Sequence, residues 1–82
     1  ALDLLVLNPP RAGLKDGVHA LARLGAKHIC LCECRPESMA RDVTRLEALG
    51  YGLEQLTLFD MFPHTRHVES VAWLSRLDVQ PS

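Results

Sequence analysis

The sequence predicts an α/β fold, arranged as half of an open, doubly wound sheet with two helices. Short apolar runs without helical spacing, such as Leu2–Leu7 and His28–Cys32, are typical of buried strands. Between such runs, apolar residues recur every three or four positions, which indicates amphipathic helices. Each helical stretch is followed by a glycine, Gly25 or Gly50, which is a common helix terminator.

The first strand and helix occupy the amino-terminal third of the chain. Leu2 to Leu7 is interrupted only by Asp3 and ends at Asn8–Pro10, which suits a parallel strand that stops at a rigid loop. Gly13–Lys15 connects this loop to the helix. The apolar residues at helical spacing are Val18, Leu21, Ala22 and Leu24.

The remaining elements follow the same logic. His28–Cys32 predicts a second buried strand, and Pro36 suits the first turn of a second helix. The apolar positions of that helix are Met39, Val43, Leu46 and Leu49. Leu53–Phe59 and Val68–Leu77 predict the third and fourth strands.

These elements predict three parallel strands and one antiparallel strand. Helical crossovers connect the first three strands, whereas the last connection is short and contains no predicted helix. We expect one domain over residues 1–77, a frayed tail over 78–82, and an origin as a piece of a larger protein. A G-x-G sequence occurs only at Gly50–Gly52, before a strand, so half of a nucleotide-type cofactor site is expected to be missing.

Composition limits the classes of function. The 82 residues are 48% hydrophobic and 23% charged, with a net charge of −1. These are ordinary globular values that give no electrostatic signature of nucleic-acid binding by this segment alone. The sequence contains no run of about 18 apolar residues, so no membrane span is predicted. Three cysteines without a signal peptide favour the reducing cytoplasm.

Cys34 is the best candidate nucleophile. It follows the second strand and precedes Arg35 and a predicted helix start, where positive charge favours the reactive thiolate. Cys30 and Cys32 lie within the strand, and we expect them to behave as small buried hydrophobic residues. Alternating strand positions form poor tetrahedral geometry, so no metal site is predicted.

Two further polar groups are candidates for a site. Asn8 lies at the carboxyl end of the first strand, where α/β sheets bind ligands, and its amide matches the donor and acceptor edge of uracil; a simple turn explains it equally well. Glu69 is the last residue of the Asp60–Glu69 segment, in which Pro63 is expected to stiffen the backbone. Its carboxylate would serve as a base, and its alternative role is that of a surface acid.

Together these segments resemble the RNA uracil-5-methyltransferase family over residues 2–77. The family patterns are a D-P-P-R-x-G turn, an S-C-N-P turn followed by A-R-D, and a D-x-F-P-x-T-x-H-x-E loop. The corresponding segments here are Asn8 to Gly13, Glu33 to Pro36 with Ala40 to Asp42, and Asp60 to Glu69. The last pattern is the most specific.

The resemblance implies a Rossmann-like class I methyltransferase sheet, of which this chain is the carboxyl-terminal half. It implies that Cys34 adds to C6 of uracil in rRNA or tRNA and that C5 receives a methyl group from S-adenosylmethionine. Glu69 would then remove the C5 proton, and Asn8 would contact the ring. The base would have to be flipped out of structured RNA. Most of the S-adenosylmethionine site would lie outside this segment, which we expect to be inactive alone.

Three positions depart from the family pattern. Asn8 replaces Asp, Glu33 replaces Ser, and Arg35 replaces Asn. A charged Glu33 beside Cys34 would oppose thiolate formation. One alternative is a degenerate, non-catalytic α/β module for RNA binding or assembly, whose first strand could pair with a second copy. Another is an amino-group methyltransferase of the N-P-P type, although Arg11 replaces the aromatic residue expected there.

Overall fold

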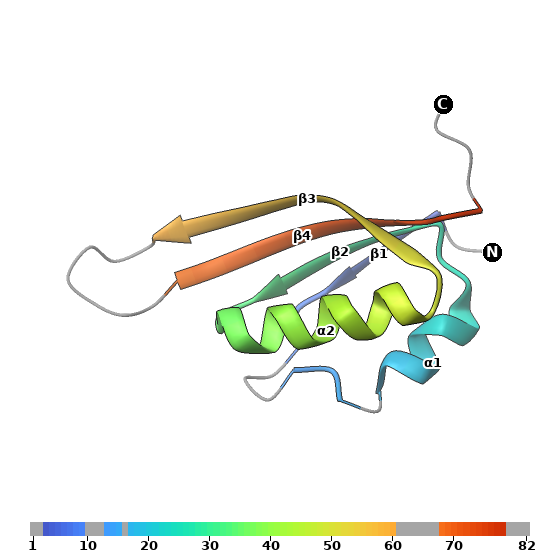
Figure 1. Ribbon diagram of the computed structural model, residues 1–82, viewed down its shortest axis with the longest axis horizontal. Helices are drawn as coiled ribbons and strands as arrows, with labels where there is room; N and C mark the ends of the chain where they lie inside the picture. Colours follow the sequence, from blue (N-terminus) through green and yellow to red (C-terminus); the bar gives the residue numbers. More distant parts are fainter. Residues whose placement is uncertain (1–2, 10–12, 16, 61–67, 79–82) are drawn as a thin grey trace.

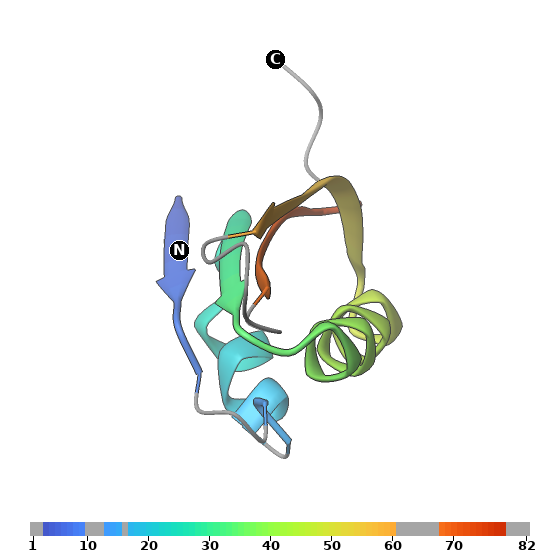
Figure 2. The same cartoon turned by 90° about the vertical axis from the view of Figure 1, so that its left-hand side faces the viewer.

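The computed structural model describes residues 3–9, 13–15, 17–60 and 68–78. A single four-stranded sheet forms one layer, and two helices form the other, both on the same face of the curved sheet (Figures 1 and 2). The elements are β1 (Leu4–Leu7), α1 (Gly17–Leu24), β2 (His28–Glu33), α2 (Pro36–Ala48), β3 (Tyr51–Asp60) and β4 (Val68–Arg76). The predicted α/β class and the two helices are therefore confirmed.

The strand order is β1-β2-β4-β3, and only the β1–β2 pair is parallel. The predicted antiparallel direction of β4 is confirmed, because it pairs antiparallel with both β2 and β3. The prediction of three parallel strands is not confirmed, because only β1 and β2 pair in parallel. β3 runs in the same direction as β2, but β4 lies between them. The short β3–β4 connection makes a hairpin whose second strand still has a free edge, and that edge pairs with β2.

Local sequence explains where the elements begin and end. Pro36 occupies the first turn of α2, and Gly25 and Gly50 adopt φ angles of 66° and 99°, which side chains disfavour. β3 begins at Tyr51, two residues earlier than predicted, because this side chain is buried and its hydroxyl donates a hydrogen bond of 2.6 Å to the Ala26 carbonyl.

The core lies between the sheet and the helices. Alternation along each strand sends every second side chain to this helix-covered face. Ile29 and Leu31 of β2 lie beside Ala72 and Leu74 of β4, and all four are fully buried. The other core residues come from α2, the start of β3 and the connection before β2, and they are Ala26, Met39, Val43, Leu46 and Tyr51.

The opposite, open face carries no helix among the described residues (Figure 2). Its side chains include Val6 of β1, Cys30 and Cys32 of β2, and Val71 and Trp73 of β4. Val6 is 63% exposed, in keeping with a position on the outer strand of the sheet.

The topology brings four strand ends to one edge of the sheet. The carboxyl ends of β1, β2 and β3 and the amino end of β4 lie together there, at the left of Figure 1. We call this the site edge, because the sequence-predicted site residues belong to these strand ends.

Candidate active site

The structure places the three predicted site residues at the site edge. Asn8 follows the last residue of β1 and is exposed. Cys34 lies in a bend directly after β2, two residues before α2 begins, and is half-buried. Glu69 is the second residue of β4 and is also half-buried.

Strand register shows how these residues relate. Glu33 pairs with Ser70 in the antiparallel β2–β4 ladder, so continuing the register by one residue sets Cys34 opposite Glu69. Both positions have the open-face parity of the ladder. Leu7 pairs with Leu31 in the parallel β1–β2 ladder, and the same continuation sets Asn8 beside the next open-face position of β2. One amide, one thiol and one carboxylate therefore share one edge.

The neighbouring thiols differ from Cys34 in position. Cys30 and Cys32 are half-buried on the open face, not fully buried as the sequence suggested, because no described helix covers them. Burial raises the pKa of the Cys32 thiol, and Cys30 and the Glu69 charge raise it further. Cys32 is therefore held in the unreactive thiol form, whereas Cys34 lies beyond the strand, at the turn into α2.

The Glu33 side chain does not lie beside Cys34, where its charge was expected to oppose thiolate formation. It is on the helix-covered face, 2% exposed, and neither carboxyl oxygen meets hydrogen-bond geometry with a described partner. Burial, then hydrogen bonding to Asp42 and the Asp42 charge, raises the pKa of Glu33 to about 8, whereas Arg41 lowers it. Asp42 is thus close enough to act on Glu33 without a well-formed hydrogen bond. At neutral pH the Glu33 carboxyl is mostly uncharged.

This raised pKa predicts a pH-dependent stability. The folded state holds a proton on Glu33 up to about pH 8, whereas the unfolded chain releases it near pH 4.5. The stabilisation that the Glu33 proton contributes to the folded state is therefore complete below the pKa of the unfolded chain. It is lost as pH rises through the pKa of the folded state. We expect the free energy of unfolding to fall by the order of 2 kcal/mol from about pH 6 to about pH 9.

Urea denaturation of the 82-residue chain across this pH range measures the effect. Glu33→Gln cannot titrate and should flatten the profile. Glu47→Gln changes an exposed acid of α2 and should leave the slope as it is. If the free energy of unfolding of the parent changes with pH as little as that of Glu33→Gln, the raised pKa of Glu33 is contradicted.

The loop between β3 and β4 was expected to be a rigid support for Glu69. Its residues Met61–His67, with Pro63, His64 and His67, lie outside the described residues. Phe59, near the end of β3, is 46% exposed and pairs with Glu69 across the β3–β4 ladder. What positions Glu69 in the described structure is therefore the ladder itself.

Sequence reasoning did not single out Asp42 as a structural group. This carboxylate is only 1% exposed and accepts a 2.9 Å hydrogen bond from the Leu14 amide in the loop after β1. The signal was available, because Asp42 falls three residues after Met39 and four before Leu46, on the apolar face of α2. An acid at such a position needs buried partners.

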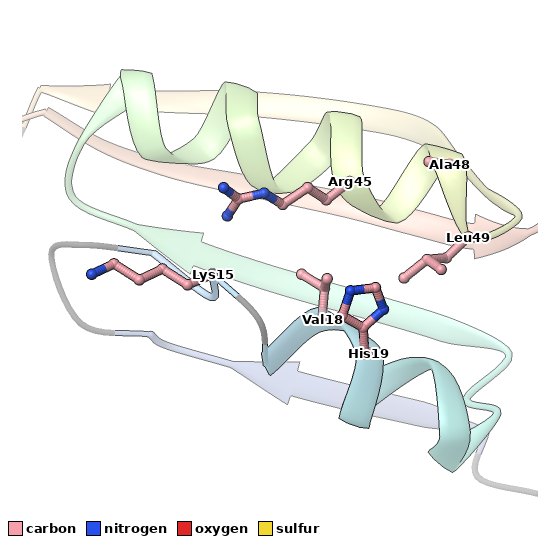
Figure 3. Close-up of a pocket in the computed structure, with 6 residues that line it drawn as sticks. All are labelled: Lys15, Val18, His19, Arg45, Ala48 and Leu49. Carbon is pink, nitrogen blue, oxygen red and sulfur yellow. The ribbon is translucent and has the colours of Figure 1, made fainter.

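A separate cavity of about 200 Å³ lies between α1 and α2 (Figure 3). The side chains of Val18 and His19 extend from α1 toward α2, while Lys15 and Arg45 flank the opening. It contains none of the three predicted site residues. Among the described residues there is also no cluster of metal-binding side chains, and no helix is both long and apolar enough to cross a membrane.

Comparison with known proteins identifies the family. The family model described as tRNA (uracil-5-)-methyltransferase matches residues 1–77, nearly the entire chain. The chain belongs to this family. The resemblance inferred from the three sequence motifs is thereby confirmed.

Relatives within the tRNA (uracil-5-)-methyltransferase family are considerably longer. The 23S rRNA (uracil(1939)-C(5))-methyltransferase RlmD of Alcanivorax borkumensis is 44% identical over 75 residues, which are 92% of this chain and 17% of that protein. RlmD of Vibrio cholerae is 46% identical over 68 residues, which are 83% of this chain and 16% of that protein. This chain therefore spans about a sixth of their length.

A solved structure of a family member has the same fold. The tRNA (uracil-54, C5)-methyltransferase of Pyrococcus abyssi, solved in complex with S-adenosyl-L-homocysteine, superposes with a TM-score of 0.75 and 41% identity. The match covers 90% of this chain and 18% of that one. The mixed sheet with two helices therefore also occurs as a segment of that larger methyltransferase.

Proposed function

We propose that this chain is a catalytic segment of an enzyme that methylates C5 of uracil in RNA. The observation that carries the proposal is the convergence of Asn8, Cys34 and Glu69 at one edge of the sheet, in a chain of the tRNA (uracil-5-)-methyltransferase family. The relatives named above act on uracil in tRNA or 23S rRNA, which supports RNA as the substrate class.

The three residues have complementary roles in this proposal. The Cys34 thiolate adds to C6 of uracil and makes C5 nucleophilic. S-adenosylmethionine, when bound, supplies the methyl group. The Glu69 carboxylate then removes the proton from C5, and the electron pair of that C–H bond restores the C5–C6 double bond as the Cys34 sulfur leaves. Extending the β2–β4 register by one residue beyond Glu33 and Ser70 supports this pairing, because a shared substrate ring requires Cys34 and Glu69 to lie near each other.

Asn8 contributes recognition rather than charge. Its side-chain amide offers one donor and one acceptor, which match the acceptor and donor that uracil presents side by side. Asn8 is exposed and lies beyond the end of β1, so a flipped base can reach it. The replacement of the family Asp thus preserves hydrogen bonding to the ring while removing a negative charge.

Most of the cofactor site belongs elsewhere in the protein. The described strand-to-helix turns contain no glycine-rich sequence of the kind that cradles a nucleotide. We place the S-adenosylmethionine site in the remaining part of a Rossmann-like class I domain, of which residues 1–77 are the carboxyl-terminal portion and 78–82 a tail. The isolated 82 residues therefore neither bind S-adenosylmethionine tightly nor methylate RNA. Three free cysteines suit a cytoplasmic enzyme.

A second candidate function is a non-catalytic assembly module. β1 is an outer strand of the sheet, with Leu4 45% and Val6 63% exposed. An unpaired strand edge can pair with a second copy or with another part of the same protein. Sedimentation of the isolated chain separates these alternatives, because pairing with a second copy gives a mass that rises with concentration.

The proposed function is tested with the full-length protein and RNA that contains 5-fluorouracil. Fluorine at C5 cannot leave as a proton, so the reaction is expected to stop at a covalent protein–RNA adduct that requires S-adenosylmethionine. The adduct is detected as a slower band on a denaturing gel and located by mass spectrometry. A protein that methylates uracil RNA without forming this adduct contradicts the covalent route, and one that does neither supports the assembly module.

A further inference from the structure

Asp42 joins two segments that are far apart in the sequence. Its side chain comes from the middle of α2 and is 1% exposed. Its Oδ2 atom accepts the Leu14 N–H at 2.9 Å, across 28 residues of chain. Leu14 lies between β1 and α1, six residues after Asn8, so a buried carboxylate on α2 anchors the backbone there.

Gly13 shows how closely the loop and the carboxylate approach. Its φ angle is +83°, and a Cβ atom at this position would lie 2.8 Å from Asp42 Oδ2. Real Cβ atoms essentially never approach an atom so closely. The backbone thus passes directly over the carboxylate, and the glycine of the Asn8–Gly13 motif is explained by Asp42.

Glu33 is a second buried acid, 2% exposed and adjacent in sequence to Cys34. Burial, hydrogen bonding to Asp42 and the Asp42 charge raise its pKa to about 8. Its main chain is also fixed, since the Ser70 hydroxyl donates a 3.1 Å hydrogen bond to the Glu33 carbonyl. The turn that contains Cys34 leads directly into α2, and Asp42 of α2 holds Leu14 in the connection after β1.

Among the described residues, two arginines of α2 act on Asp42 and Glu33. From α2, Arg45 Nη1 lies 3.4 Å from Asp42 Oδ1, and Arg41 acts on Glu33. Arg45 also lines the cavity between the helices, together with Lys15 and His19 (Figure 3). Ser70 of β4 faces Glu33 as an uncharged group. Arg45 and Arg41 are thus the positive groups that act on this pair, and Arg45 is partly exposed.

We propose that Asp42 is a positioning residue that fixes Asn8 relative to Cys34, because it ties the chain between β1 and α1 to α2, the helix that begins two residues after Cys34. This inference rests on the proposed function and adds a group that touches neither uracil nor cofactor. When Glu33 loses its proton, its charge repels that of Asp42 beside Arg41 and Arg45, which weakens the hold on the Leu14 amide. We therefore expect Asp42 to hold Leu14 more firmly at pH 7 than at pH 9.

The test compares variants of the full-length protein by the rate of adduct formation with 5-fluorouracil RNA. Asp42→Ala is expected to lower the rate between about ten- and a hundredfold, as misplaced binding groups do, with little change in RNA affinity. Asp42→Asn retains an acceptor oxygen for the Leu14 amide and should recover most of the rate. Glu47→Ala, an exposed acid on α2, is the matched control and should react like the parent.

The pH profile separates positioning from simple loss of structure. Glu33→Gln should lose less of the adduct rate from pH 7 to pH 9 than the parent does. Hydrogen exchange at the Leu14 amide provides a readout independent of chemistry and should accelerate in Asp42→Ala and Gly13→Ala. A folded Asp42→Ala protein with parental adduct rate and parental Leu14 protection would overturn the proposal. Absence of an adduct in the parent would defeat the proposed function, whereas Leu14 exchange would still report on the hydrogen bond from Leu14 to Asp42.

Discussion

Replacement of Cys34 by alanine in the full-length protein is expected to abolish methyl transfer to uracil RNA. Without the thiolate no bond forms to C6, C5 does not become nucleophilic, and the rate should fall by at least about a thousandfold. The 5-fluorouracil adduct should disappear as well. Cys34 is suited to this role because it lies beyond the end of β2, at the turn into α2 and opposite Glu69.

Two companion variants make the Cys34 experiment specific. Cys32→Ala removes a neighbouring thiol whose pKa is raised by burial, and it should retain the adduct. Glu69→Gln leaves the nucleophile but removes the base, so it should accumulate a methylated protein–RNA adduct that does not resolve. If Cys32→Ala loses the adduct and Cys34→Ala retains it, the nucleophile is Cys32 and the proposed role of Cys34 is wrong.

Leu46→Ala is expected to be the most damaging single change to the stability of the chain. Leu46 is fully buried in the core between α2 and the sheet. Leucine-to-alanine changes at such sites cost about 2–5 kcal/mol. A domain of this size has a total stability of only about 4–12 kcal/mol, so the variant should be largely unfolded at moderate urea concentrations.

Leu58→Ala is the matched control, because it makes the same chemical change at a position on β3 that is 62% exposed. It should cost less than about 1 kcal/mol. Circular dichroism during urea denaturation of the two variants and the parent gives the comparison. Equal losses at both positions would be inconsistent with a core between α2 and the sheet.

The helices and strands were largely predictable from the sequence because their signals are local. Pro36 and Gly50 bound α2, and apolar spacing identifies its buried side. The order of the strands was not predictable by the same means. Whether β4 pairs with β3 alone or also enters between β3 and β2 depends on contacts between distant segments, and periodicity along one strand contains no such information.

The candidate site shows the same division. Asn8, Cys34 and Glu69 were found from residue type and motif order, and the topology then brought them to one edge. The roles of Glu33 and Asp42 were missed, because spacing alone did not show that Glu33 faces away from Cys34 toward α2. Two acids that seemed unrelated in the sequence become neighbours only once β2 and α2 pack together.

The central place of β4 has a consequence for the order of events during protein synthesis. β4 is the last described strand to leave the ribosome, yet it contacts both β2 and β3. Until Val68–Arg76 has emerged, the strand that precedes Cys34 has one unpaired edge and the sheet cannot close. The strand that completes the sheet is also the one that carries Glu69. Cys34 and Glu69, the proposed nucleophile and base, are therefore brought together at the same late step at which the sheet is completed.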